Sequence, residues 1–370
     1  MNLFLFAIAR HKPANPQLLA VAWAPTAPRS QRLAAALGAE MHKVHFLTFQ
    51  RPLMAPPKYF AQAFVTCRLL WRRHPRVVLV QNPPIFLVMA VALYARLTGN
   101  HYIIDTHTGG LVGYKWGWSL PLHRWFSRQA LATLVTNASL RERLLGGSSR
   151  RSFRVFILGD PPVEWCDTAP LSIPQQGARQ VTVIATYSAD EPIEEFLAAA
   201  RQLPDVSFSI TGDARRLPAA VRAGCPENVR LTGWLSDAEY CALVCRANVV
   251  VALTTRNHTL LCGAWEALYA GQPLITSDWP VLRMTFPQGT VFTGATSTEI
   301  QAAIHLALAQ EDHLRVAMQS LAASKRQSWA LAIAELRALI PEYENVSRKR
   351  PLRDTNEAGQ KVEGAIDAER

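Results

Sequence analysis

The fold is decided by residues 228–278, which read NVRLTGWLSDAEYCALVCRANVVVALTTRNHTLLCGAWEALYAGQPLITSD. Three apolar runs in this stretch have the length of buried strands, and the segments between them have the length and spacing of helices. Ser236 and Glu239 have the spacing of a capping box that starts a helix, and Gly271 is placed to end the next one. Strands that alternate with helices in this way predict a parallel sheet built from crossover units. The strands are expected at 229–232, 248–253 and 273–276, and the helices at 237–246 and 263–270.

The same alternation continues on both sides of this stretch. Asp190 is placed to cap a helix whose first position is Pro192, and Thr296 and Glu299 repeat the capping-box spacing. Two such series predict an α/β protein with two Rossmann-like, doubly wound parallel-sheet domains that face a cleft. Further strands are expected at 18–24, 44–49, 77–80, 101–104, 132–136, 153–157, 181–185 and 206–210. Further helices are expected at 31–37, 57–74, 85–98, 120–131, 297–310 and 314–340.

Composition predicts where these domains begin and end. A proline-rich stretch with little periodicity separates the two series, and the last part of the chain is highly charged, which is typical of disorder. We expect an N-terminal domain at 1–165, a linker at 166–179, a C-terminal domain at 180–341 and a disordered tail at 342–370.

Several classes of protein are disfavoured by the composition. The chain is 49% hydrophobic, so it can bury large cores and is not disordered as a whole. Its 6 cysteines form no CxxC pair, which disfavours a zinc site and a dense disulfide framework. No run reaches the roughly 18 apolar residues of a membrane-spanning helix, and residues 1–12 lack the pattern of a signal peptide. A reducing, cytoplasmic location is therefore expected.

Charge is distributed unevenly along the chain. The formal net charge is +11, yet residues 1–170 hold 20 Lys and Arg against 6 Asp and Glu, whereas residues 171–370 hold 19 against 22. Such asymmetry indicates an anionic partner for the first half: nucleic acid, a membrane surface or a phosphorylated ligand. No nucleic-acid-binding module is found, so nucleic acid is not an expected partner.

A predicted helix in the first half has one apolar and one cationic face. This mixture suits the headgroups of an anionic membrane, where aromatic rings lie at the boundary and arginine meets phosphate. A solvated basic face beside ordinary core aromatics is the alternative. The residues of this expected membrane surface are Trp71, Arg72, Arg73 and Arg76.

The first candidate site lies where a strand gives way to a helix, at 254–266. A helix start offers unpaired N–H groups and the positive end of the helix dipole, which suits a diphosphate. Gly263 lets the backbone approach closely, and the Glu266 carboxylate can accept two ribose hydroxyls. Arg256 and His258 add charge or hydrogen bonds. The ordinary preference of helix starts for acidic residues explains Glu266 equally well.

The loop at 186–191 is a weaker candidate for the same site. In an enzyme with two facing sheets it would face the donor phosphates, and Ser188 supplies a hydroxyl there. Two acidic residues in the loop make it an awkward place to bind an anion.

The other candidate site is a strand that runs into a polar, glycine-rich loop. Asp105 and His107 lie two residues apart at the strand end, a pair that can serve as acid and base or hold a sugar. Alternation along the strand places both side chains on one side. A structural Asp–His turn is the alternative. Further residues expected on this acceptor side are Gln81, Asn82, Gly109 and Gly110.

Residues 228–278 resemble the donor-nucleotide half of family-4-type glycosyltransferases with the GT-B fold. That family commonly carries two glutamates separated by seven residues; Glu266 matches the second, and His258 stands at the first position. The resemblance implies that Glu266 holds the nucleotide ribose and that position 258 contacts the donor sugar. An Arg and a Lys that the family places after the first strand of this domain have no counterpart here. The candidates to replace them are Arg215, Arg216 and Arg256.

Residues 81–110, QNPPIFLVMAVALYARLTGNHYIIDTHTGG, resemble the acceptor domain of chitobiosyl-diphosphodolichol β-mannosyltransferases and their bacterial relatives. This resemblance implies an acceptor sugar on a polyisoprenyl diphosphate, presented at a membrane. Together the two resemblances imply transfer of a hexose from a nucleoside-diphosphate sugar, with no cofactor. They also imply no bound metal, because many GT-B enzymes offset the charge of the leaving group with helix dipoles and basic side chains.

We therefore expect a hexosyltransferase of polysaccharide or glycolipid synthesis, peripheral on the inner face of the membrane. Its expected catalytic residues are Asp105, His107 and His258, and its expected donor contacts are Arg256, Gly263, Glu266 and Ser188. A sugar-nucleotide 2-epimerase-like enzyme is one alternative, although a soluble substrate would not need the basic first half. A non-catalytic GT-B subunit that binds nucleotide or a partner is the other.

Overall fold

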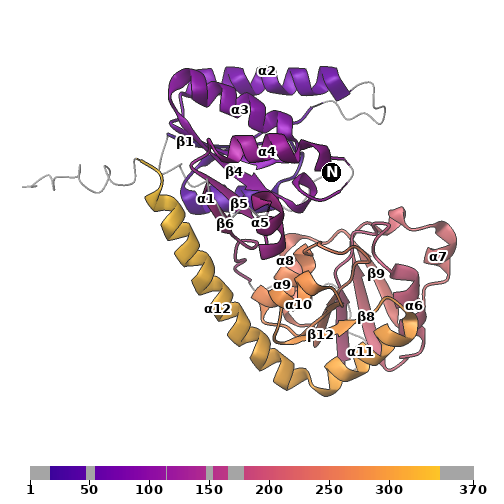
Figure 1. The fold of residues 1–370 in the computed structure, drawn as a ribbon. Helices are drawn as coiled ribbons and strands as arrows, with labels where there is room; N and C mark the ends of the chain where they lie inside the picture. Colours follow the sequence, from indigo (N-terminus) through magenta and orange to yellow (C-terminus); the bar gives the residue numbers. More distant parts are fainter. Residues whose placement is uncertain (1–16, 47–54, 114, 147–152, 166–178, 342–370) are drawn as a thin grey trace, which may run out of the picture.

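The computed structural model describes residues 17–46, 55–113, 115–146, 153–165 and 179–341. They form two lobes, each a parallel sheet covered by helices, with one long helix running along both (Figure 1). The expected linker at 166–179 lies outside the described residues except for Arg179, and so does the expected tail at 342–370.

The first domain is built on a six-stranded sheet in the order β2-β1-β3-β4-β5-β6, in which every neighbouring pair is parallel. Its central strands are apolar runs buried along their length, as expected when helices cover both faces. The strands are β1 (Leu18–Ala22), β2 (Glu40–Lys43), β3 (Val77–Asn82), β4 (His101–Thr106), β5 (Ala132–Val135) and β6 (Val155–Ile157). The helices are α1 (Pro28–Leu37), α2 (Ala55–Arg73), α3 (Ile85–Thr98), α4 (Leu120–Ser127) and α5 (Ala138–Leu145).

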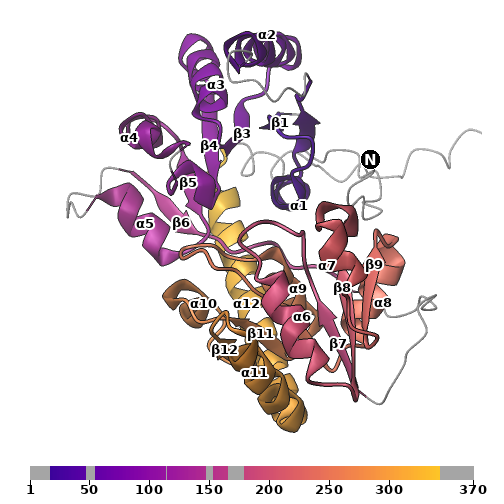
Figure 2. The same ribbon diagram turned by 90° about the vertical axis from the view of Figure 1, so that its right-hand side faces the viewer.

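The second domain repeats this plan with the order β12-β11-β10-β7-β8-β9, again all parallel (Figure 2). Each sheet has one place where the strand order reverses, beside β1 in the first domain and beside β7 in the second. The prediction of two doubly wound sheets is confirmed. The strands are β7 (Arg179–Val183), β8 (Val206–Thr211), β9 (Val229–Gly233), β10 (Val249–Ala252), β11 (Leu274–Ser277) and β12 (Thr290–Thr293). The helices are α6 (Ile193–Arg201), α7 (Ala219–Ala223), α8 (Asp237–Cys245), α9 (Cys262–Ala270), α10 (Pro280–Thr285) and α11 (Ser297–Ala309).

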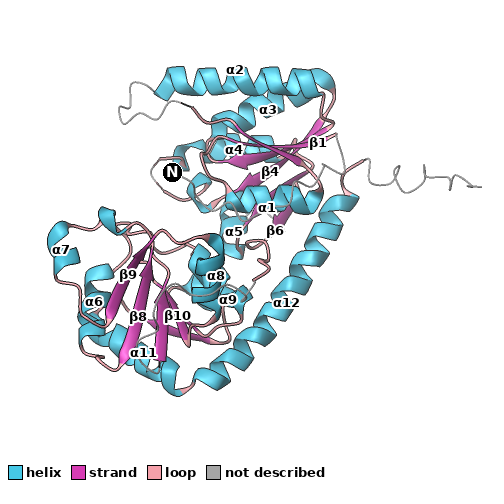
Figure 3. Cartoon of the chain, turned by 180° about the vertical axis from the view of Figure 1, so that it is seen from behind, coloured by secondary structure: helices cyan, strands magenta, loops and turns pink. Residues whose placement is uncertain are grey.

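The last helix, α12 (Glu311–Ala338), crosses from the second domain to the first (Figures 1 and 3). Met318 and Leu321 pack into the core around α9. Ile333 and Leu336 pack instead with residues of α1 and β1. The chain therefore returns to the domain in which it begins, and α12 ties the two lobes together.

The sequence signals for helix ends were reliable. Ser236 and Glu239 form the expected capping box at the start of α8, and Thr296 and Glu299 form the one at α11. The helix predicted at 85–98 has those bounds and ends at Gly99, whose φ of 71° is left-handed.

Asp190 does not have the predicted role of capping α6. The N-cap of that helix is Pro192, without a side-chain hydrogen bond among the described residues. The Asp190 carboxylate instead accepts a hydrogen bond of 2.7 Å from Thr254 Oγ1. The loop before α6 therefore turns toward the end of β10, and the side chain of Asp190 contacts Thr254 and not the start of α6.

The prediction of a strand at 44–49 is also wrong, because the observed strand, β2 (Glu40–Lys43), begins four residues earlier. It carries polar side chains at the edge of the sheet, so no apolar run marks it. Its position follows from Gly38, which ends α1, and from its parallel pairing with β1. Residues 47–49 lie outside the described residues. Four short elements, α5, α7, α10 and β12, were not predicted.

Candidate active site

The carboxyl ends of the two sheets face each other across a cavity of about 620 Å³, which we call the cleft. In the first domain the lining includes residues that follow β1 and β4 and Gln81 at the end of β3, and in the second it includes residues at or after the ends of β7, β8 and β9. Doubly wound sheets bind ligands at the carboxyl ends of their strands, beside the point where the strand order reverses. Both domains present that point to the cleft, since the loops after β1 and β7 line it.

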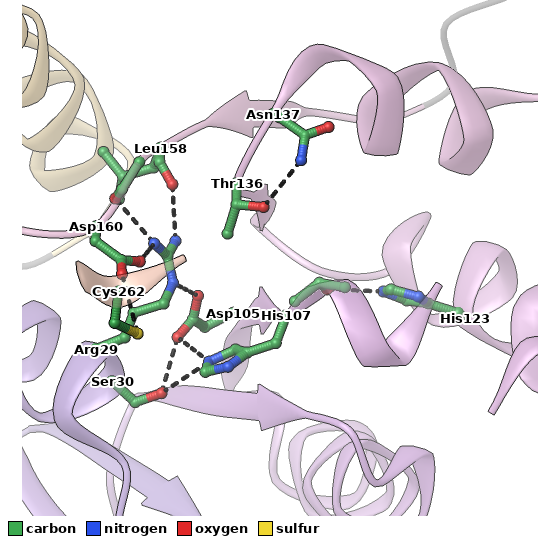
Figure 4. Close-up of polar contacts among 12 residues, drawn as sticks. Arg29, Ser30, Asp105, His107, His123, Thr136, Asn137, Leu158, Asp160 and Cys262 are labelled. Carbon is green, nitrogen blue, oxygen red and sulfur yellow. Dashed lines mark hydrogen bonds and ion pairs between the residues drawn. The ribbon is translucent and has the colours of Figure 1, made fainter. Parts of the chain in front are cut away.

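Arg29, in the first turn of α1, ties together the strand ends on the first-domain wall of the cleft (Figure 4). Its guanidinium donates to Asp105 Oδ1 at 3.2 Å and to Asp160 Oδ1 at 2.9 Å. It also donates to the carbonyl oxygens of Leu158 and Gly159, each at 2.8 Å. Because Arg29 is buried and forms these four hydrogen bonds, it sets the shape of this wall.

Asp105, His107 and Ser30 form a hydrogen-bonded cluster beside Arg29 (Figure 4). Asp105 Oδ2 accepts from Ser30 Oγ at 2.9 Å and lies 3.3 Å from His107 Nε2. Ser30 Oγ lies 3.4 Å from the same ring nitrogen, so the imidazole does not lie between them as in a serine-hydrolase triad. His107 lines the cleft, whereas Asp105 is fully buried behind it.

The charge on Asp105 is stabilised by its neighbours. Burial would raise the pKa of this carboxyl, but the charge of Arg29, the charge of His107 and the hydrogen bonds outweigh burial and hold the pKa well below its usual range. Asp105 is therefore an ionised, buried carboxylate that orients the imidazole of His107.

The expected acceptor-side residues separate into a wall and its support. Gln81 lines the cleft, and its Oε1 has no partner among the described residues. Asn82 is buried, and its carbonyl accepts from the His107 amide at 2.8 Å. A Cβ on Gly110 would lie 2.8 Å from Asn82 Nδ2, and one on Gly109 would lie 3.8 Å from Pro83. Asn82 and the two glycines thus hold the loop that carries His107.

Glu266 lies on the opposite wall, in the second turn of α9. The Tyr240 hydroxyl donates to its Oε2 at 2.6 Å. Burial raises the pKa of Glu266, while the Tyr240 hydrogen bond and the charge of Arg32 act in the opposite direction. The effect of Arg32 crosses the cleft, because Arg32 belongs to α1 of the first domain.

The start of α9 opens on the cleft. Leu260 and Cys262 line it, and the N-cap, Leu261, forms no side-chain cap among the described residues. The first N–H groups of the helix are thus not covered by a capping side chain. Gly263 acts here through packing, since a Cβ would lie 2.8 Å from Ile184 Cγ2, and it allows α9 to lie close to the sheet.

Three residues predicted at the donor site lie elsewhere. Among the described residues that line the cleft, Arg256, His258 and Ser188 do not appear. Arg256 is 65% exposed and pairs with Asp190 at 3.4 Å. His258 lies in the following loop with a left-handed φ of 64°.

Ser188 belongs to a loop that binds its own carboxylate. The amides of Thr186 and Ser188 donate to Glu191 at 2.9 and 3.3 Å. The N–H groups of this loop are therefore already occupied by an internal anion. This explains the acidic residues that looked unsuitable for binding a phosphate.

Several residues of the cleft were not predicted from the sequence, among them Arg32, Tyr240 and Trp234. Arg32 belongs to the helix that follows the first strand of its domain, and it lines the cleft. The strand order reverses beside this strand, which is where doubly wound sheets bind ligands. Arg216, one of the candidates to replace the missing basic residues, lines the cleft and donates to the Thr186 carbonyl at 2.7 Å. Arg215 is not among the described lining residues and pairs with Asp213, which does line the cleft. Tyr240 and Trp234 carried no recognisable signal. The described residues contain no group of three or more His, Cys, Asp or Glu side chains placed to hold a metal ion.

Comparisons with known proteins agree with this architecture. Residues 179–332 match the model of a family described as glycosyl transferase-like. A search of curated proteins found no match. Sucrose-phosphate synthase from Thermosynechococcus elongatus superposes with a TM-score of 0.68 at 14% identity, over 89% of this chain and 99% of that one.

Two further structures carry a link to nucleotide sugars. A putative UDP-N-acetylglucosamine 2-epimerase from Listeria monocytogenes has a TM-score of 0.61 at 14% identity, over 90% of this chain and 97% of that one. HepE from Anabaena, solved with UDP and glucose, has a TM-score of 0.60 at 12% identity, over 86% of this chain and 99% of that one. These likenesses establish the GT-B fold predicted from the sequence.

Proposed function

We propose that this protein is a glycosyltransferase that takes a nucleoside-diphosphate sugar in the cleft and transfers a hexose to an acceptor on the first domain. The observation that carries the proposal is the placement of Glu266, a carboxylate held by Tyr240 at 2.6 Å, one turn beyond the open start of α9. A carboxylate beside a helix start suits the ribose and the diphosphate of one nucleotide. The UDP and glucose bound by HepE support a UDP-sugar as the donor.

The diphosphate is held from both walls in this proposal. The start of α9 supplies N–H groups, and Arg32 supplies a guanidinium from the first domain. Arg216 adds a second cation on the second domain. Because these groups come from both domains, donor binding favours the closed arrangement, which also excludes water from the reaction. The basic groups offset the charge of the departing nucleoside diphosphate without a metal.

His107 is the proposed general base on the acceptor side. Asp105 accepts a hydrogen bond from the protonated ring nitrogen, which leaves the other nitrogen to take a proton. That nitrogen accepts the proton of the acceptor hydroxyl while its oxygen bonds to the anomeric carbon. The bond from this carbon to the diphosphate breaks, and its electron pair leaves with the nucleoside diphosphate. Gln81, beside His107 on the wall, is the proposed contact to the acceptor sugar.

The acceptor is proposed to be a saccharide on a polyprenyl diphosphate, reached at an anionic membrane. Helices α2, α3 and α4 all pack into one core cluster on one face of the first sheet, so their outer sides share a surface. α1 and α12 pack on the other face. In the described residues, no helix combines the length and apolar character needed to span a membrane.

This surface, which we call the apolar helix surface, exposes large side chains at helical spacing. Such an exposed apolar area marks an interaction site. Arg68, Arg72, Arg96 and Arg128 are exposed beside it and match anionic headgroups. Arg73 pairs with Glu40 at 3.1 Å, and Arg76 follows the end of α2. The exposed apolar residues are Phe60, Phe64, Trp71, Met89, Leu93, Leu97, Trp118, Leu122 and Trp125.

The test is transfer of radiolabel from UDP-, GDP- and dTDP-hexoses to a bacterial polyprenyl-diphosphate-saccharide extract by the purified full chain. A labelled lipid with one donor is the expected result, and Glu266→Ala, if it melts like the wild type, should not form it. Conversion of UDP-N-acetylglucosamine to its 2-epimer without acceptor would favour the epimerase-like alternative. Nucleotide binding with neither reaction would favour a non-catalytic subunit.

A further inference from the structure

A second cavity, of about 280 Å³, lies at the junction of the two domains and is bordered by α12. Its walls come from the residues after β5 and at the end of β6 in the first domain, and from α9 and α10 in the second. Trp265 lines both this junction pocket and the cleft. Its ring packs on Gly159, where a Cβ would lie 2.4 Å from Trp265 Cη2, so the ring forms a partition between the two cavities.

Two donor groups of the junction pocket have no side-chain hydrogen bond to any residue that the structure describes. Lys325 and Trp329 are one turn apart on α12, so they lie on the same side of the helix. Trp329 Nε1 is buried and has no hydrogen-bond partner among the described residues. Lys325 is half-buried, burial lowers its pKa, and no Asp or Glu is among the described residues that line the pocket with it.

The remaining lining combines apolar side chains, among them Ile157, Val281 and Met284, with neutral polar ones, and the described residues that line the pocket include no Asp or Glu. Burying an ammonium and an N–H group without partners is unfavourable, and native proteins rarely leave such groups unsatisfied. A ligand with an anionic group would satisfy both donors, and the apolar walls would receive its body. The volume limits this ligand to a small molecule.

We propose that the junction pocket binds a small organic anion with an apolar or aromatic body, held by Lys325 and Trp329, and that this ligand bridges the two domains. The α12 donors hold the anionic group, while Ile157 of the first domain and Met284 of the second contact the body from opposite walls. Because the ligand contacts both domains, its binding stabilises their present arrangement, and through Trp265 it reaches the wall that carries Glu266. This inference does not depend on the reaction catalysed in the cleft.

The test uses benzoate as the probe, with the full chain in titration calorimetry. Lys325→Gln should raise the benzoate Kd by about tenfold or more, because a charge-assisted contact is lost. Trp329→Phe, which keeps the ring packing and removes the N–H, should raise it by about threefold. Arg222→Gln removes one exposed positive charge on α7 as the matched control and should leave the Kd within about twofold. Benzyl alcohol, which has the ring without the charge, should bind about tenfold more weakly than benzoate.

Hydrogen exchange of the same samples tests the bridge. Benzoate should slow deuterium uptake in peptides over 136–140 of the first domain and over 280–285 of the second, and Lys325→Gln should abolish both effects. Equal benzoate affinity in Lys325→Gln and wild type would overturn the site, provided that both melt alike. Protection confined to one domain would overturn the bridging role. Neither readout requires nucleotide binding, so failure here is separate from failure of the proposed transferase.

Discussion

The Tyr240 hydroxyl donates a hydrogen bond of 2.6 Å to Glu266 Oε2, and this contact joins α8 to α9 at the wall of the cleft. Burial makes the charged carboxylate unfavourable and raises the pKa of Glu266, whereas the tyrosine and Arg32 partly restore the charged form. A carboxylate in this state gains from every hydroxyl that a ligand brings to it. The pair therefore prepares the cleft for a hydroxyl-bearing ligand at some cost to the free protein.

Glu266→Gln should stabilise the free protein and weaken its binding of UDP. A raised folded-state pKa means that the stability contribution of this carboxyl is present at low pH and is lost as pH rises through that pKa. Glutamine stays neutral, so the variant should gain about 1 kcal/mol at about pH 8 and little at about pH 4. Urea unfolding at both pH values measures the gain, and calorimetry should show a UDP Kd about tenfold higher. The exposed Glu227→Gln is the control, and a gain that did not change with pH would contradict the reasoning.

Arg32→Gln should weaken the binding of UDP and leave uridine binding unchanged. Arg32 lines the cleft on the domain opposite Glu266, so it is placed to meet a diphosphate and not a ribose. We expect the UDP Kd to rise by about tenfold and the uridine Kd to stay within about twofold. Arg222→Gln, whose arginine is exposed on α7 and is not among the described residues that line the cleft, is the matched control. Equal losses for UDP and uridine would mean that Arg32 acts by shaping the cleft.

Asp105→Asn should destabilise the protein in a pH-dependent way. Burial opposes ionisation of Asp105, but Arg29, His107 and the hydrogen bonds lower its pKa overall. A lowered folded-state pKa gives stability that is present above the ordinary carboxyl value and is lost as pH falls toward the folded value. The variant should therefore be about 3 kcal/mol less stable at neutral pH, with the difference shrinking below about pH 4. Thermal unfolding across this pH range measures the difference in stability between Asp105→Asn and the wild type, and Asp205→Asn, at an exposed position, is the control. A difference that did not change with pH would disprove the electrostatic cause.

The layers of the fold could be predicted because their elements carry local signals. The apolar run that forms α3 is bounded by Pro84 and Gly99, and both capping boxes were recognisable by spacing. The polar strand β2 has no such signal, since its place depends on pairing with β1. Short elements such as α10 have too few residues for periodicity to register.

The site could be predicted only in part, because much of it depends on contacts between distant segments. Gln81 and His107 were predicted because polar residues at strand ends meet at one edge of a sheet, and Glu266 because it lies near a helix start; all three line the cleft. Arg29 was not found, because its partners Asp105 and Asp160 are 76 and 131 residues away. For the same reason the pairing that holds Arg256 to Asp190, outside the cleft, had no trace in the sequence.

His107→Ala should lower kcat while leaving donor affinity nearly unchanged. The imidazole lines the cleft and is oriented by Asp105, so its removal takes away the base without disturbing the opposite wall. A loss of about 100-fold to 10,000-fold in kcat is expected for a general base, with the UDP Kd within about twofold. Transfer assays and calorimetry measure the two quantities. His101→Ala, at the exposed start of β4, is the control. A raised Kd with unchanged kcat would give His107 a role in binding only.

Leu93→Glu combined with Leu97→Glu should release the protein from vesicles of phosphatidylglycerol and phosphatidylcholine. These leucines are 55% and 65% exposed on α3, at the centre of the apolar helix surface. A glutamate at either position is unfavourable in the acyl region of the membrane and is repelled by the anionic headgroups. Leu331→Glu is the matched control, because Leu331 is 60% exposed on α12, on the opposite face of the first domain. This variant should sediment with vesicles as the wild type does. A triple variant should sediment less than the wild type with anionic vesicles only; its substitutions are Arg72→Gln, Arg73→Gln and Arg76→Gln. This loss should be larger at low salt, because salt screens the attraction between arginine and the headgroups. Arg73 contributes least, because it pairs with Glu40. If the α3 and α12 variants sedimented alike, the membrane would have to be met by another face of the molecule.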